Sequence, residues 1–198
     1  MAEDAWQEEC LITISREGYG DVTFQGLTET VDIEPGEKDL EGVPLVNGGR
    51  VKKTTPEGDS TFTFEAYPIA VGTTATADDT AGLGFFDLLH SPDTSQPLSI
   101  SNSRTRNDYR VSVLWTSDTT VANAVDSCTT ASESMRISGA RGNFTSVKPS
   151  FTDGIQKTTV VYKTPAFNKS GDSNLKFESA DTTVPLAALN AYTSTTAF

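Results

Sequence analysis

The sequence predicts a mainly β protein: an antiparallel β-sandwich or curved, barrel-like sheet with one flanking α-helix and a long loop between two strands. Apolar and polar residues alternate over several runs, which is the pattern of half-buried strands. Turn dipeptides separate neighbouring runs, and Asp153-Gly154 is the strongest of them. A single segment has apolar residues at helical spacing. With 198 residues, the chain is expected to form one domain, 1–198.

Two runs show the alternation most clearly, at residues 60–71 and 109–115. Their apolar faces are Phe62, Phe64 and Ala66 in the first, and Tyr109, Val111, Val113 and Trp115 in the second. Gly142-Asn143 is expected to reverse the chain between two later strands. The further strands that we expect are 11–16, 21–30, 98–104, 135–141, 144–151, 156–164 and 174–179.

The helix is expected at residues 78–90. Asp78 and Asp79 are capping residues there, and they precede apolar residues at helical spacing, namely Leu83, Phe86 and Leu89. His90, the only histidine, stands at the end of this helix, where the helix dipole favours a cation, so a capping role outweighs a catalytic one.

The segment 33–50 is expected to be an irregular arm. The residues that interrupt regular structure are Pro35, Gly36, Gly42, Pro44, Gly48 and Gly49, and the apolar residues among them are Leu40, Val43, Leu45 and Val46. Long connections without secondary structure are functional or disordered, and a disordered one would be poor in Leu and Val. We therefore expect the arm to pack on another subunit. For the C-terminal segment 180–198, two placements are open, since residues 184–192 can dock as a short helix or pair with a neighbour.

The chain is strongly acidic, with 27 Asp and Glu against 15 Lys and Arg and a formal net charge of -12. This charge argues against binding to nucleic acid or anionic membrane through a basic face. Two interpretations of the acidity remain: an ordinary solvated surface, or adaptation to high salt, where screening relieves repulsion between carboxylates. Salt adaptation predicts that the fold weakens when salt is removed.

Catalytic signatures are missing from the sequence. GxSxG, HExxH and GxxxxGK[ST] do not occur, and neither Cys10 nor Cys128 has the spacing of a metal or redox site. We therefore expect no cofactor, no bound metal and no enzymatic activity, and reduced cysteines. The N-terminus is acidic without a following apolar run, which predicts synthesis and assembly in the cytoplasm and no membrane association.

Two blocks of the sequence together suggest a family. In the first, the arm leads through Gly49-Arg50-Val51 and the turn Thr55-Pro56-Glu57-Gly58-Asp59 into the strand that begins at Ser60. In the second, the run 140–154, which ends in Thr152-Asp153-Gly154, is followed by the strand 158–167. The chain resembles major tail tube proteins of tailed viruses of the siphovirus type, and its acidity suggests viruses that infect haloarchaea.

The resemblance implies a structural virion protein. Members of that family form homohexameric rings that stack into a hollow tail tube, which conducts double-stranded DNA during ejection without binding it specifically. Partners would be further copies of the chain and other tail proteins, namely the tape measure, the baseplate or tip and the terminator. The inter-ring or subunit interface would comprise Pro35, Leu40, Val43, Pro44, Leu45, Val46 and Arg50. Acidic residues that would face the lumen are Glu65, Asp118 and Asp172.

Two other classes of function are compatible with the same sequence. An acidic β-sandwich that decorates a capsid or acts as an adhesin would show the same alternation. An acid glycosidase would need only two carboxylates facing a sugar, and no motif in the sequence reveals such a pair.

Overall fold

We describe the fold from a computed structural model, for residues 9–18, 21–25, 30–54, 56–66, 108–129, 133–180 and 183–198. This part of the chain is mainly β, and its strands pair antiparallel throughout, as the alternation predicts. The expected helix 78–90, with His90, and the expected strand 98–104 lie outside the described residues.

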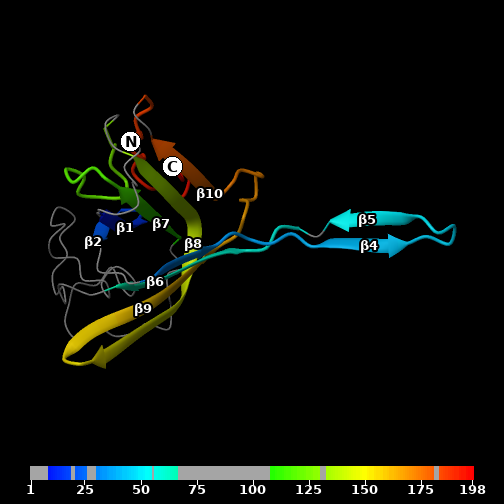
Figure 1. Ribbon diagram of the computed structural model, residues 1–198, viewed down its shortest axis with the longest axis horizontal. Coiled ribbons are helices and arrows are strands. Elements are labelled where there is room, and N and C mark those ends of the chain that lie inside the picture. Colours follow the sequence, from blue (N-terminus) through cyan, green and yellow to red (C-terminus); the bar gives the residue numbers. More distant parts are fainter. Residues whose placement is uncertain are drawn as a thin grey trace, which may run out of the picture.

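Eight strands form one continuous sheet in the order β2-β1-β7-β8-β9-β6-β3, with β10 paired to β8, and two more form a separate hairpin, β4-β5 (Figure 1). The strands are β1 (Glu9–Arg16), β2 (Val22–Gln25), β3 (Val31–Glu34), β4 (Leu40–Pro44), β5 (Arg50–Thr54), β6 (Ser60–Ala66), β7 (Tyr109–Thr116), β8 (Ser134–Thr152), β9 (Ile155–Thr164) and β10 (Leu175–Ala180). Asp153 and Gly154, both at positive φ (54° and 79°), make the predicted two-residue turn between β8 and β9.

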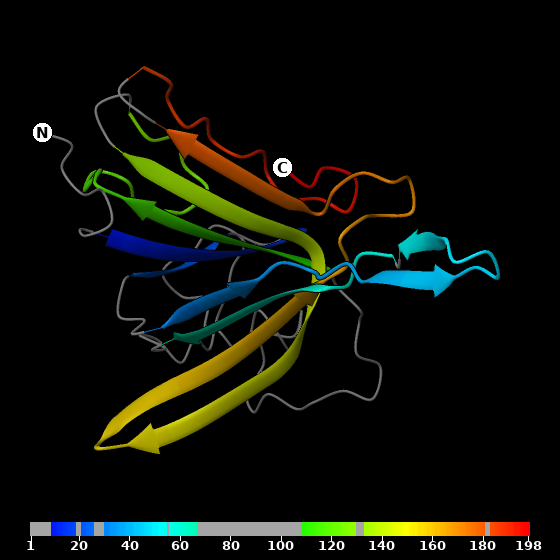
Figure 2. The same cartoon turned by 45° about the vertical axis from the view of Figure 1, so that its right-hand side comes forward.

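The sheet has two layers, one around β1 and β7 and the other around β6 and β9. The long strand β8 belongs to both layers. Its first half pairs with β7 and β10, and its second half, from Asn143, pairs with β9. Figure 2 shows it curving from one layer into the other. The predicted turn at Gly142-Asn143 is therefore wrong: Arg141 takes φ 55° and bends the strand without reversing it.

A tyrosine hydroxyl holds this bend. The Tyr162 hydroxyl accepts a hydrogen bond from the Gly142 amide at 3.0 Å and lies 2.7 Å from the Tyr109 carbonyl and 2.9 Å from the Gly139 carbonyl, to which it can donate its one proton. A Cβ on residue 142 would lie 2.4 Å from the Lys163 carbonyl oxygen, so only glycine fits there. Burial raises the pKa of Tyr162 well above its usual value, which keeps the hydroxyl a donor.

Substituting Tyr162→Phe tests this role. The change leaves the buried Gly142 amide without its acceptor, and an unpaired buried amide costs about 1–3 kcal/mol. We expect the thermal midpoint to fall by roughly 2–10 °C with the fold retained, measured by circular dichroism. An unchanged midpoint would show that the bend does not depend on the hydroxyl.

The main core lies between the two layers. Phe62, Phe64 and Ala66 of β6 are buried, which confirms the predicted apolar face of that strand. Across the core they meet the apolar residues of β1 and β7, and Trp115 packs at its edge. Cys10 and Cys128 do not form a disulfide bond, as expected.

The other face of the β1–β7–β8 layer is covered by irregular chain. The loop 117–129 and the C-terminal segment 183–198 lie on it, and Leu186, Tyr192 and Ala197 are buried there. Leu186 forms an isolated antiparallel bridge with Cys128. The helical placement of residues 184–192 is therefore wrong, because the segment is irregular and packs against its own subunit.

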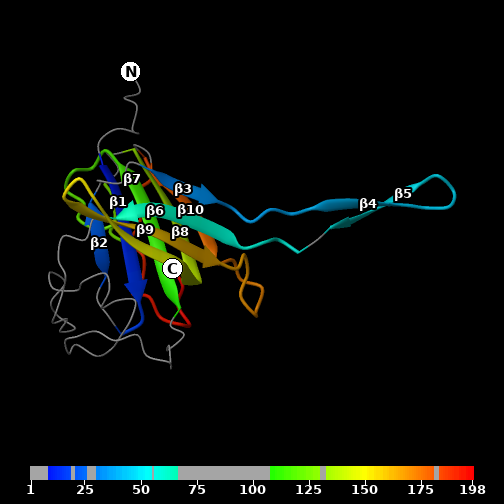
Figure 3. The same cartoon turned by 90° about the horizontal axis from the view of Figure 1, so that it is seen from below.

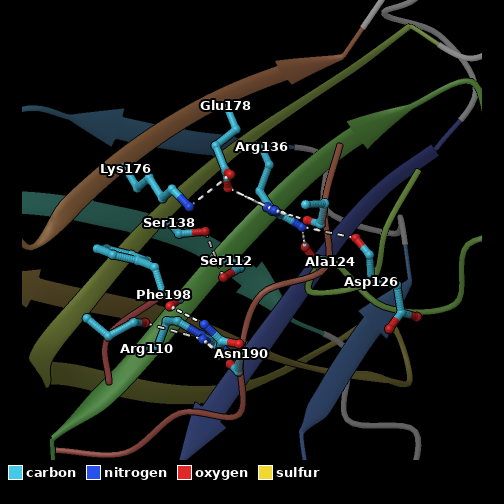
Figure 4. A network of polar contacts seen from close by, with 12 residues as sticks. Arg110, Ser112, Ala124, Asp126, Arg136, Ser138, Lys176, Glu178, Asn190 and Phe198 are labelled. Carbon is cyan, nitrogen blue, oxygen red and sulfur yellow. Dashed lines mark hydrogen bonds and ion pairs between the residues drawn. The ribbon is translucent and has the colours of Figure 1, made fainter. Parts of the chain in front are cut away.

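Two fully buried arginines anchor these irregular segments (Figure 4). Arg136 of β8 donates to the Glu178 carboxylate at 2.8 Å and to the backbone carbonyls of Asp126 and Ala187. Arg110 of β7 donates to the Asn190 carbonyl at 2.8 Å, and burial lowers its pKa. Carbonyl groups in chain without regular structure need donors, and these guanidinium groups supply them.

Candidate assembly interface

Among the elements that the structure describes, the arm is the most exposed. β4 and β5 project from the body along the longest axis of the molecule (Figures 1 and 3). Every residue of both strands is exposed, and the apolar residues among them include Leu40 at 68% exposure. Val46 at the tip is fully exposed, at 110%. An isolated two-stranded hairpin is only marginally stable in water. Packing against a further surface would stabilise this hairpin.

The base of the arm is fixed to the body. The Gly36 amide donates to the Ser60 hydroxyl at 3.2 Å, and the Gly58 amide donates to the Glu37 carbonyl at 3.0 Å. A Cβ on residue 36 would lie 1.9 Å from the Gly58 carbonyl oxygen, so the two chain segments approach as closely as glycine allows. The arm therefore leaves the body in a defined direction.

The tip of the arm is an ordered turn. The Leu45 amide donates to the Gly49 carbonyl at 2.7 Å, and the Gly48 amide donates to the Leu45 carbonyl at 3.0 Å. Gly48 has φ 81°, and the Asn47 side chain accepts from the Gly49 amide at 3.2 Å. These bonds present the side chains of Leu45 and Val46 to solvent on a closed loop.

The hairpin has two faces of different character. Strand register places Val43 opposite Val51 and Glu41 opposite Lys53, and Leu45 follows on the same side. This face is apolar, with one charge of each sign. The opposite face holds Pro44 and Leu40 from β4 together with Arg50 and Lys52 from β5, and it has no acidic residue.

Two expectations about the arm need correction. The segment is a regular hairpin and not an irregular loop, because both its strands are edge strands and tolerate Gly42 and Pro44, whose missing side chain or amide disrupts no core and no sheet ladder. Sequence reasoning named Arg50 but missed Lys52 and Lys53. The signal was a basic cluster, Arg50-Val51-Lys52-Lys53, in a chain that is otherwise acidic.

The three acidic residues considered for a lumen lie in different surroundings. Glu65 on β6 forms an ion pair with Lys157 at 3.4 Å. Asp118 is buried, and its carboxylate accepts hydrogen bonds from Thr120 and Thr129, which lower its pKa, so it holds the loop 117–129 together. Asp172 is exposed and accepts from the Asn168 side chain at 2.9 Å.

Glu65 belongs to the outward face of the layer formed by β3, β6, β9 and the second half of β8. The strand register puts three acidic residues, three lysines and several threonines on this face. The charged residues are Asp32, Glu34, Glu65, Lys148, Lys157 and Lys163. In the described residues this face therefore balances its charges, although the whole chain is acidic.

The described residues contain no group of three His, Cys, Asp or Glu side chains placed to hold a metal ion. They also contain no helix that is long and apolar enough to span a membrane.

No protein-family model and no curated protein sequence matches the chain. Among solved structures, it is similar to the PVC sheath-tube complex of an extracellular contractile injection system, at 13% identity and TM-score 0.46, over 86% of this chain and 88% of that one. It is also similar to the PVC sheath/tube terminator, at 11% identity and TM-score 0.45, over 87% and 94% of the two chains. For a crystal structure of Hcp protein the identity is 10% and the TM-score 0.38, over 88% and 99%.

Proposed function

We propose that the protein is a structural subunit that self-associates through its arm into hexameric rings, which stack as a hollow virion tail tube. The observation that carries this proposal is the ordered hairpin with exposed Leu40, Val43, Leu45, Val46 and Val51. Apolar area that leaves water contributes about 25 cal/mol per Å², so covering these side chains favours association. The defined direction of the arm, fixed at Gly36 and Gly58, suits a contact repeated identically between copies.

Open strand edges add a second reason for association. In the described part of the chain, β2 and β3 lie at the two ends of the strand order, and β10 pairs only with β8. Such edges invite pairing with another chain. Ring closure would satisfy them, and the outward face of β3, β6 and β9 would then line the channel.

The proposed lumen suits passage of DNA without retention. Phosphate contacts by Lys and Arg supply most non-specific DNA affinity. On the proposed lumen face, Lys148, Lys157 and Lys163 are matched by an equal number of carboxylates, and one lysine is paired directly with Glu65. Double-stranded DNA therefore meets no net positive surface there. Other tail proteins would close the two ends of the tube.

Electron microscopy of the concentrated, purified protein tests the proposal. We expect rings and hollow filaments with sixfold symmetry. Monodisperse monomers at every concentration would contradict it and favour a capsid-decorating or adhesin-type module. Turnover of oligosaccharides at acid pH would instead establish a glycosidase.

A further inference from the structure

In the structure the arm comprises the hairpin 40–54 and the base that leads into it, and these two parts differ in charge. The fifteen residues of the hairpin, 40–54, hold one acidic and three basic residues, a net charge of +2 in a chain of net charge -12, so the remainder carries -14. The base that leads into the hairpin is acidic. Its exposed carboxylates are Glu37, Asp39, Glu57 and Asp59, against the single Lys38.

Two of the three positive charges of the hairpin form no ion pair in the part of the chain that the structure describes. Arg50 and Lys52 lie on the face that has no acidic residue, and neither takes part in an ion pair among the described residues. The Arg50 side chain lies across Gly42, where its Cδ would be 3.8 Å from an added Cβ. Its aliphatic part thus packs on the hairpin while the guanidinium remains available to a partner.

We propose that the basic face of one copy's hairpin docks on the acidic base of the arm of a second copy. The occupant of this surface is another copy because one chain carries both complementary charges, in the two halves of the same projecting element. A contact between two different patches is heterologous, so a pair of copies still has one unoccupied hairpin and one unoccupied acidic base, and the contact propagates. This inference rests on the proposed function and specifies the contact by which the copies associate.

Salt dependence follows from the proposed contact. Exposed charges attract over a Debye length of about 10 Å at 0.1 M salt and about 3 Å at 1 M. Assembly should therefore weaken as salt rises through this range. Adaptation of the fold to high salt would act in the opposite direction on the thermal midpoint of the subunit, so the two effects are separable in one salt series.

Charge reversal tests the contact. Lys52→Glu should raise the critical concentration for assembly about tenfold or more at low salt, whereas Lys169→Glu, an equal charge change on an exposed loop, should leave it within about twofold. Glu37→Lys in the base should act like Lys52→Glu. Because every copy supplies both halves, the double variant Lys52→Glu/Glu37→Lys should recover most of the assembly lost in the single variants. Light scattering and pelleting give the critical concentrations.

The possible failures are distinguishable. If the wild type assembles and Lys52→Glu behaves like Lys169→Glu, the electrostatic contact is refuted and the tube function stands. If both single variants fail but the double variant does not recover, the hairpin docks on a different surface and the proposed acidic base is wrong. A wild type that never assembles at any salt overturns the proposed function and this contact together.

Discussion

Replacing residues 39–56 with Asn-Gly is expected to give a folded monomer that cannot form tubes. The register of β3 with β6 places Glu34 opposite Thr61, and the Gly58 amide still bonds to the Glu37 carbonyl further along the base. Continued by one residue, this register places Lys38 opposite Glu57, a position that a two-residue Asn-Gly turn can close. Every described residue that the deletion removes is exposed, and none belongs to the core.

The deletion is expected to have a large effect on assembly and a small effect on stability. We expect assembly to be lost completely at concentrations where the wild type forms tubes, as seen by electron microscopy and sedimentation velocity. The thermal midpoint should change by no more than about 4 °C, since substitutions that leave the core untouched cost little. Tubes of normal length from the shortened chain would show that the arm is not the assembly element.

Phe64→Asp is expected to unfold the subunit. The Phe64 side chain is 1% exposed and lies opposite Val160 of β9 and Val31 of β3, in a core of mainly apolar side chains. Truncating a buried phenylalanine costs about 3–5 kcal/mol, and burying an unpaired carboxylate adds to that cost. The sum is comparable with the total stability of an ordinary domain, about 5–15 kcal/mol.

Phe64→Leu is the matched control for this prediction. It keeps an apolar side chain of similar volume at the site and should cost less than about 2 kcal/mol, with the cooperative transition preserved. Both variants are best made in the monomeric chain without the arm, so that assembly does not contribute to the measured midpoint. A folded Phe64→Asp variant with a near-normal midpoint would mean that residue 64 is not in the core.

The strands that form the core could be predicted because apolar and polar residues alternate along each of them. Phe62 and Phe64 on β6, and Val111 and Val113 on β7, have apolar residues at every second position. The Asp153-Gly154 turn could also be predicted, since its conformation depends on two adjacent residues. These features need no knowledge of the rest of the chain.

Features that depend on distant residues could not be predicted. The bend in β8 is held by Tyr162, twenty residues further on, so its sequence looked like two strands with a turn. Arg110 and Arg136 sit where alternation predicts a solvated face, and they are buried because the C-terminal segment covers that face. The hairpin of the arm has no core to impose alternation, and its glycines and proline obscured its strands.

The arm is expected to contact another copy of the chain. To test this contact, a photo-crosslinking amino acid replaces Val46 at the fully exposed tip. The full-length protein is crosslinked both before and after assembly. We expect covalent dimers and longer ladders on a denaturing gel, in proportion to assembly, with the crosslink mapped by mass spectrometry to a residue of a second copy. Crosslinks confined to the same chain, with the tip folded onto its own body at every concentration, would contradict it.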